Sequence, residues 1–174
     1  MNHIEKRRLN DHRKANGTEW VSPKKARKAD REARNKNWVA QTRDELLKKD
    51  NVGERSATLK LVEAGVEFER EHYVLCTASG KPRQAFIDFY VTAVPLEKRK
   101  RSCRIAVEVD GSIHNSPLAK QRDRQRDADM MRDGVVDVIL RVPSHIALRW
   151  GVSQWRAAVV SASYLPKSVV NVQG

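Results

Sequence analysis

The residues of this chain best suited to chemistry lie in the stretch Ile105–His114, which reads IAVEVDGSIH. Side chains alternate between the two faces of a strand, so Glu108 and Asp110 would share one face and leave the other to aliphatic residues. Burying adjacent carboxylates is costly unless positive charge compensates, and a divalent cation can do so. Such an ion beside an imidazole could hydrolyse a phosphate ester. The alternative is a hairpin edge whose acids are solvated.

A further acid of interest is Asp88, which stands within Gln84–Val91, QAFIDFYV. The aromatic and β-branched residues of this run predict a strand. A charged residue inside such a run is rare unless it is paired or binds a metal. If the two strands are neighbours, Asp88 and Glu108 can meet over one ion. Otherwise Asp88 lies on an edge strand and points to water.

The composition favours a polyanionic partner, most simply a nucleic acid. The chain has 174 residues, a formal net charge of +12 and 40% hydrophobic residues, enough for one core and an additional arm. An acidic membrane surface would require a strongly apolar helix face, which the basic segments lack. The sequence shows no membrane-spanning run and no signal peptide, so we expect no membrane association and a cytoplasmic location.

The cysteines and histidines argue against a disulfide framework and a structural zinc site. Cys76 and Cys103 are isolated from each other, and the five histidines are scattered along the chain. This pattern fits a reducing compartment.

The N-terminal residues 1–50 are predicted to form a basic arm. Lys and Arg dominate this segment, and a helix over 24–34 would begin after Ser22-Pro23. The arm would contact the phosphate backbone, and the alternative is a solvated charged helix. Its candidate DNA-binding residues are Lys24, Lys25, Arg27, Lys28, Arg31 and Arg34.

Residues 51–150 are predicted to form the main domain, and 151–174 a C-terminal helix and tail that pack on it. A helix over 52–64 would carry Glu54 on its core-facing stripe. The expected elements that follow are an extended segment 66–75, the two acidic strands, a helix 117–132, a strand 135–142 and a helix 152–163. The strand–helix–strand order predicts parallel pairing of the strands around the helix 117–132.

Two basic clusters flank the acidic strands. A basic loop over 95–103 would join the strands and supply the candidate DNA contacts Lys98, Arg99, Lys100 and Arg101. In the helix 117–132, acids and arginines alternate at i, i+4 spacing, which fits a surface lattice of ion pairs. The alternative directs Asp127 or an arginine toward the site, where Arg122 and Arg126 could bind flanking phosphates.

Five segments in a fixed order carry a family resemblance: Glu54 on its helix, Phe86-Ile87-Asp88-Phe89-Tyr90, Val107-Glu108-Val109-Asp110-Gly111-x-x-His114, Arg122-Asp123-x-x-Arg126-Asp127, and Val138-Ile139-Leu140-Arg141. Together they resemble the very-short-patch-repair endonuclease group of the PD-(D/E)xK nuclease superfamily, with the related phage homing endonucleases. The resemblance covers roughly residues 50–145. It implies an α/β, restriction-endonuclease-like core, in which a mixed central sheet is flanked by helices.

The resemblance also implies roles for individual residues. Asp88 and Glu108 would bind Mg²⁺, with Mn²⁺ as a substitute, and the carbonyl of Val109 could add a ligand. Glu54 matches a helical glutamate that contacts the metal or its waters. His114 would transfer a proton, and Asp127 would orient it.

One position departs from the superfamily pattern. Asp110 stands where the superfamily has a lysine, two residues after the second acid. The very-short-patch-repair type also lacks this lysine and uses a histidine instead. Asp110 is then a further ligand or an orienting group.

The implied activity is that of a metal-dependent DNA endonuclease, free-standing and of the homing or nicking type. It would act as a monomer or homodimer on DNA, without a small-molecule cofactor, in a bacterial or phage-infected cell. The alternatives are a mismatch-repair-type nicking enzyme and a catalytically inactive nucleic-acid-binding protein on the same fold. An RNA-directed enzyme ranks last, because no aromatic RNA-reading motif is visible.

Overall fold

The computed structural model describes residues 22–49, 51–80, 82–96, 98–111 and 117–173, together with Ile4. The chain divides into two compact units, Met1–Gln41 and Thr42–Gly174. Helix α2 (Pro23–Lys48) begins in the first unit and ends in the second, so it is longer than the predicted 24–34. Its residues 24–38 are exposed, as expected for a charged helix in which Lys28 and Glu32 pair across one turn.

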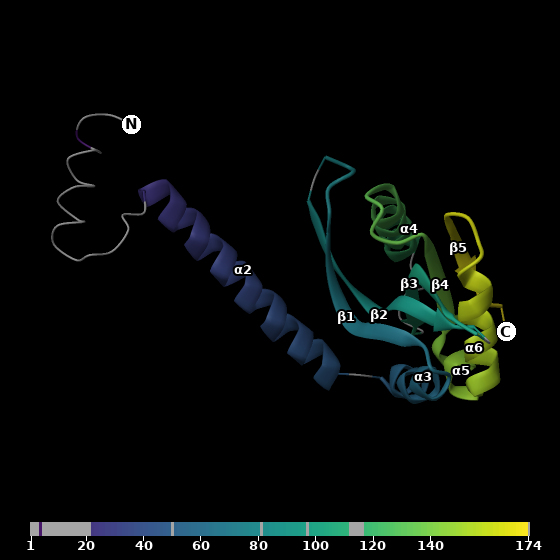
Figure 1. Cartoon of the computed structure of the whole chain (residues 1–174). Coiled ribbons are helices and arrows are strands. Elements are labelled where there is room, and N and C mark those ends of the chain that lie inside the picture. The colour runs from purple at the N-terminus through teal and green to yellow at the C-terminus, as the bar shows by residue number, and fades with distance from the viewer. Residues whose placement is uncertain are drawn as a thin grey trace. The chain divides into compact units, whose positions relative to one another are not determined.

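A five-stranded mixed sheet in the order β1-β2-β3-β4-β5 forms the centre of the second unit (Figure 1). The first three strands form an antiparallel meander, and the last two run parallel to β3. The strands are β1 (Glu67–Cys76), β2 (Arg83–Pro95), β3 (Lys100–Asp110), β4 (Val138–Pro143) and β5 (Ser168–Asn171). The parallel pairing of β3 with β4, around helix α4 (Pro117–Arg132), confirms the predicted crossover.

Helices cover both faces of this sheet, which confirms the α/β class. Three helices pack on one face: α3 (Val52–Glu63), α5 (Ser144–Arg149) and α6 (Val152–Ala162). With that face they enclose the larger hydrophobic core, in which Trp155 is fully buried as predicted. Helix α4 covers the opposite face and encloses a smaller core around Met130 and Ile139. No helix in the described part of the chain is long and apolar enough to cross a bilayer.

The predicted alternation of side chains along β3 is confirmed. Ile105, Val107 and Val109 all lie in the larger core, and Ala106 lies in the smaller one. Glu108 follows Ala106 at a distance of two residues, so it belongs to the face that α4 covers.

Strand β2 does not keep this alternation. Ile87 packs in the smaller core, whereas Phe89, two residues later, packs in the larger one. Residues two apart in a regular strand share a face. The strand therefore changes face at the intervening residue, Asp88.

Strand β1 changes face at the matching position. Phe68 packs against the larger core and Val74 lies in the smaller one, although both are even-numbered positions. Between them, Glu71 has a φ of +47°, in the left-handed region that glycine favours. The pairs Arg70↔Phe89 and His72↔Ile87 flank it. Their register places Glu71 opposite Asp88, so both strands change face at the same level of the sheet.

The β2–β3 connection is shorter than the predicted loop 95–103. Lys100 and Arg101 lie in β3, because the strand pairing continues almost to the tip of the hairpin. Lys100 pairs with Glu67, and Arg101 Nε donates to the Ser163 carbonyl at 2.9 Å. These two basic residues therefore have partners within the chain.

Trp155 provides a test of how this core is stabilised. Its side chain is fully buried, and its Nε1 finds no hydrogen-bond partner among the described residues. We expect Trp155→Ala to lower the free energy of unfolding by about 3–5 kcal/mol, since it creates a cavity. Trp155→Phe should lower it by less than half as much, because it also removes an unsatisfied donor. Urea unfolding measures both, and equal losses would contradict this account.

Candidate functional site

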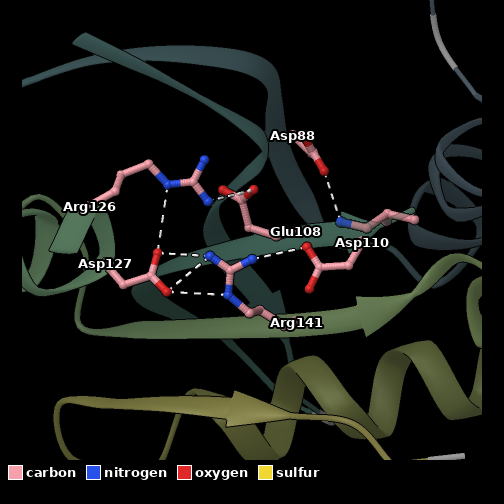
Figure 2. Close-up of polar contacts among 7 residues, drawn as sticks. Asp88, Glu108, Asp110, Arg126, Asp127 and Arg141 are labelled. Carbon is pink, nitrogen blue, oxygen red and sulfur yellow. Dashed lines mark hydrogen bonds and ion pairs between the residues drawn. The ribbon is translucent and has the colours of Figure 1, made fainter. Parts of the chain in front are cut away.

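Asp88 and Glu108 lie on neighbouring central strands, in the arrangement on which a shared ion depends. The pair Phe89↔Val107, continued by one residue, places Asp88 opposite Glu108. Asp88 Oδ2 accepts a hydrogen bond from the Val109 N–H at 2.8 Å (Figure 2). The Asp88 side chain thus accepts a hydrogen bond from a backbone amide of β3. This contact holds the Asp88 carboxylate against the strand that carries Glu108.

The two carboxylates oppose each other's ionisation. Glu108 is only 6% exposed, and burial together with the charge of Asp88 raises its pKa to about 8. Burial also raises the pKa of Asp88, against the lowering effect of its hydrogen bond from Val109. Full ionisation of both acids therefore calls for additional positive charge nearby.

Arg126 supplies part of that charge from α4. Its Nη2 lies 3.3 Å from Glu108 Oε2, and its Nε lies 3.7 Å from Asp127 Oδ1. Glu108 Oε1 is buried and has no hydrogen-bond partner among the residues that the structure describes. An orphaned carboxylate oxygen of this kind is costly unless a ligand satisfies it.

Arg141 on β4 links the remaining acids. It lies beside Glu108 in the parallel register and donates to Asp110 and Asp127, each at 2.9 Å (Figure 2). Burial lowers the pKa of Arg141, but the charges of Asp127 and Asp110 outweigh it and the pKa is raised. Asp127 is only 3% exposed and points from α4 toward the sheet. It therefore does not belong to a lattice of ion pairs on the protein surface.

The N-terminus of α3 positions Glu54 beside the same strands. Asn51 caps the helix by accepting the Glu54 N–H at 3.0 Å. A Cβ at Gly53 would overlap Ser144 Oγ and lie 3.1 Å from Val109 Cγ1, so only glycine lets the helix end approach β3 this closely. Glu54 Oε2 then lies 3.2 Å from Nη2 of Arg70.

Sequence reasoning missed two residues, Arg70 and Glu71 on β1. The Arg70 guanidinium lies 4.9 Å over the Phe89 ring and contacts both Glu54 and Glu71, the latter at 3.7 Å. Glu71 is only 5% exposed. The charged sequence EFEREH resembles a solvated edge strand. The only sign in the sequence that Arg70 and Glu71 are buried is that this strand continues into the apolar YVLC.

The other predicted residues lie apart from this cluster or outside the description. His114 falls outside the described residues. Arg122 is exposed on α4, and Lys98 and Arg99 are exposed in the β2–β3 turn. A groove of about 1210 Å³ borders the acidic cluster. Its charged and imidazole-bearing lining residues are Asp110, Lys120, Asp123, Arg124, Asp127, Arg141 and His145.

The carboxylate oxygens of this site suit a hard cation, although the acidic side chains do not converge on one point. Within the described ranges, no three His, Cys, Asp or Glu side chains are grouped closely enough to hold a metal ion. Arg126 and Arg141 instead contact oxygens of Glu108, Asp110 and Asp127. The carboxylates of Asp88 and Glu108 nevertheless provide hard oxygen donors, one of them orphaned, which is the donor chemistry that Mg²⁺ prefers.

Comparison of the chain with protein families, with curated protein sequences and with solved structures finds no match. The function of the chain is therefore inferred from the geometry of its residues.

The raised pKa of Glu108 predicts a characteristic pH dependence of stability. The folded protein binds this proton more tightly than the unfolded chain does, because the pKa rises from 4.5 to about 8. Stability that is present at low pH is therefore lost as the pH rises through this window. Glu108→Gln mimics the protonated side chain. In EDTA near pH 9, its free energy of unfolding should exceed that of the wild type by on the order of 2–4 kcal/mol. Near pH 4.5 the two proteins should differ little. Urea unfolding checks this, and a difference independent of pH would refute it.

Proposed function

We propose that this protein is a metal-dependent DNA endonuclease with a restriction-endonuclease-like core, of the very-short-patch-repair-like type. The observation that carries the proposal is the placement of Asp88 and Glu108 on neighbouring central strands, with a buried oxygen of Glu108 that has no hydrogen-bond partner among the described residues. The order α3-β1-β2-β3-α4-β4 places these acids at the centre of a mixed sheet with helices on both faces. We propose that it acts on DNA in the cytoplasm of a bacterial or phage-infected cell, in a homing or nicking role.

The acidic residues would hold Mg²⁺, or Mn²⁺ in its place, through Asp88, Glu108 and the carbonyl of Val109. When bound, the ion would supply an activated water and neutralise charge on the phosphate. Arg126 and Arg141, which now contact the acids, could then bind phosphate oxygens instead. His114 remains the candidate for proton transfer, with Asp127 to orient it.

The DNA-binding part of the proposal is supported by the net charge of +12 and by the exposed basic residues of α2. Lys and Arg side chains that contact phosphates release counterions and supply most of the affinity of such proteins. A partner with a regular phosphate backbone suits a basic helix of this length.

A second candidate is a nucleic-acid-binding protein that has the fold without catalysis. It is favoured by the pairing of Arg126 and Arg141 with Glu108, Asp110 and Asp127, because an internally paired network can serve structure alone. The two functions differ in whether Asp88 is needed for turnover.

Asp88→Asn tests catalysis. Asparagine keeps an oxygen to accept the Val109 N–H, so the fold should persist, but it removes the charge that would hold the ion. We expect nicking of supercoiled plasmid in Mg²⁺ to fall at least about 100-fold, with DNA binding retained. Glu63→Gln, on the exposed end of α3, removes one carboxylate away from the site and serves as the control.

Two results would contradict this prediction. Full cleavage by the Asp88→Asn protein would exclude Asp88 from the chemistry, and full cleavage in EDTA would exclude the metal. Intact DNA binding by a wild type that cleaves neither plasmid nor oligonucleotides would favour the binding protein.

The basic arm is tested by its salt dependence. Removal of residues 1–41, the first compact unit, should weaken DNA binding and flatten the dependence of log K on log salt between about 50 and 200 mM. The physical reason is that fewer phosphate contacts release fewer counterions. Fluorescence anisotropy of labelled duplex DNA measures the slope, and an unchanged slope would rule out the arm as a phosphate contact.

A further inference from the structure

Glu71 is a buried carboxylate that lies next to the proposed site and has no role in it so far. It is 5% exposed and stands on β1, opposite Asp88 on β2. Asp88 in turn lies opposite Glu108 on β3. The three side chains therefore occupy one level of the sheet across three adjacent strands, although only two of them belong to the predicted acidic pair.

The backbone at Glu71 is unfavourable for the residue that occupies it. Its φ of +47° lies in the left-handed region, which glycine and asparagine adopt readily and which costs a glutamate roughly 1–2 kcal/mol. Strained residues of this kind cluster at functional sites, where the side chain must be held in place. The position is also the level at which β1 and β2 both change face, so the strained residue and Asp88 are cross-strand neighbours there.

Arg70 connects Glu71 with the same site through its charge. Arg70 lies between Glu54 and Glu71, at 3.2 and 3.7 Å from their oxygens, and its guanidinium is fixed over the Phe89 ring. Asp88 is close enough for Arg70 to influence its charge. Glu54 and Glu71 are the acids that Arg70 contacts directly, and they offset part of its effect on Asp88. Independently, the buried Glu108 Oε1 lacks a hydrogen-bond partner within the described residues, which points to a ligand at this level of the sheet.

We propose that Glu71 is a further acidic residue of the cation site: its negative charge, and its hold on Arg70, strengthen the binding of a divalent cation at Asp88 and Glu108. This inference rests on the proposed function. Glu71 acts here as a positioning and electrostatic residue, not as a ligand. Loss of its charge leaves Arg70 with one acidic contact fewer, so more of the guanidinium charge acts on Asp88 and competes with the ion.

The test is a titration of the full chain with Mn²⁺ alone, followed by the electron paramagnetic resonance signal of the free ion. Glu71→Gln should weaken Mn²⁺ binding about tenfold, because one buried negative charge is lost near the ion. Glu71→Gly should weaken it equally, and its unfolding midpoint in urea should be no lower than that of the wild type, since glycine accommodates the positive φ. The matched control is Glu67→Gln, an exposed carboxylate of the same strand, which should bind Mn²⁺ as the wild type does.

The outcomes separate this inference from the proposed function. If both Glu71 variants bind Mn²⁺ within twofold of Glu67→Gln while Asp88→Asn does not bind it, the role of Glu71 is overturned and the cation site stands. If Glu71→Gly unfolds at lower urea and keeps its Mn²⁺ affinity, Glu71 is only structural and the inference is again overturned. If the wild type binds no Mn²⁺, the cation site itself fails.

Discussion

The imbalance of buried charge at the centre of the sheet is the constraint on which the rest of the structure depends. Asp88 and Glu108 stand opposite each other on adjacent strands, Glu108 buried and Asp88 half-buried, and burial raises the pKa of both. Arg126 and Arg141 offset only part of this charge, and one oxygen of Glu108 has no hydrogen-bond partner in the part of the chain that the structure describes. A cation is the partner that would balance the charge of such a cluster, in line with the proposed function.

The surrounding elements hold this cluster from three sides. The capped end of α3 approaches β3 because Gly53 has no side chain, and this brings Glu54 to Arg70. Helix α4 supplies Arg126 and Asp127 from the opposite face. Asp133, directly after the end of α4, accepts the N–H groups of Thr77 and Ala78 in the β1–β2 connection. The β1–β2 hairpin and α4 are thereby fixed relative to each other.

Much of this architecture could be predicted from the sequence, because periodicity fixes faces and elements. The alternation of β3, the helix at 117–132, the parallel pairing with β4 and the burial of Trp155 are all confirmed. Helix α5 and strand β5 were missed, since six and four residues are too short to show a period. Arg70 and Glu71 were missed for another reason. Their burial follows from a change of face at a positive φ, which no pattern of residue types reveals.

The change of face in the β1–β2 hairpin determines where acidic side chains can be buried. One end of the hairpin contributes side chains to the larger core and the other end to the smaller one. The acids lie at the level where the hairpin changes face, between the two hydrophobic cores. Neither core therefore has to enclose a charged group. Because the contribution of the hairpin to each core stops at this level, the charged side chains lie beside the apolar packing and do not interrupt it.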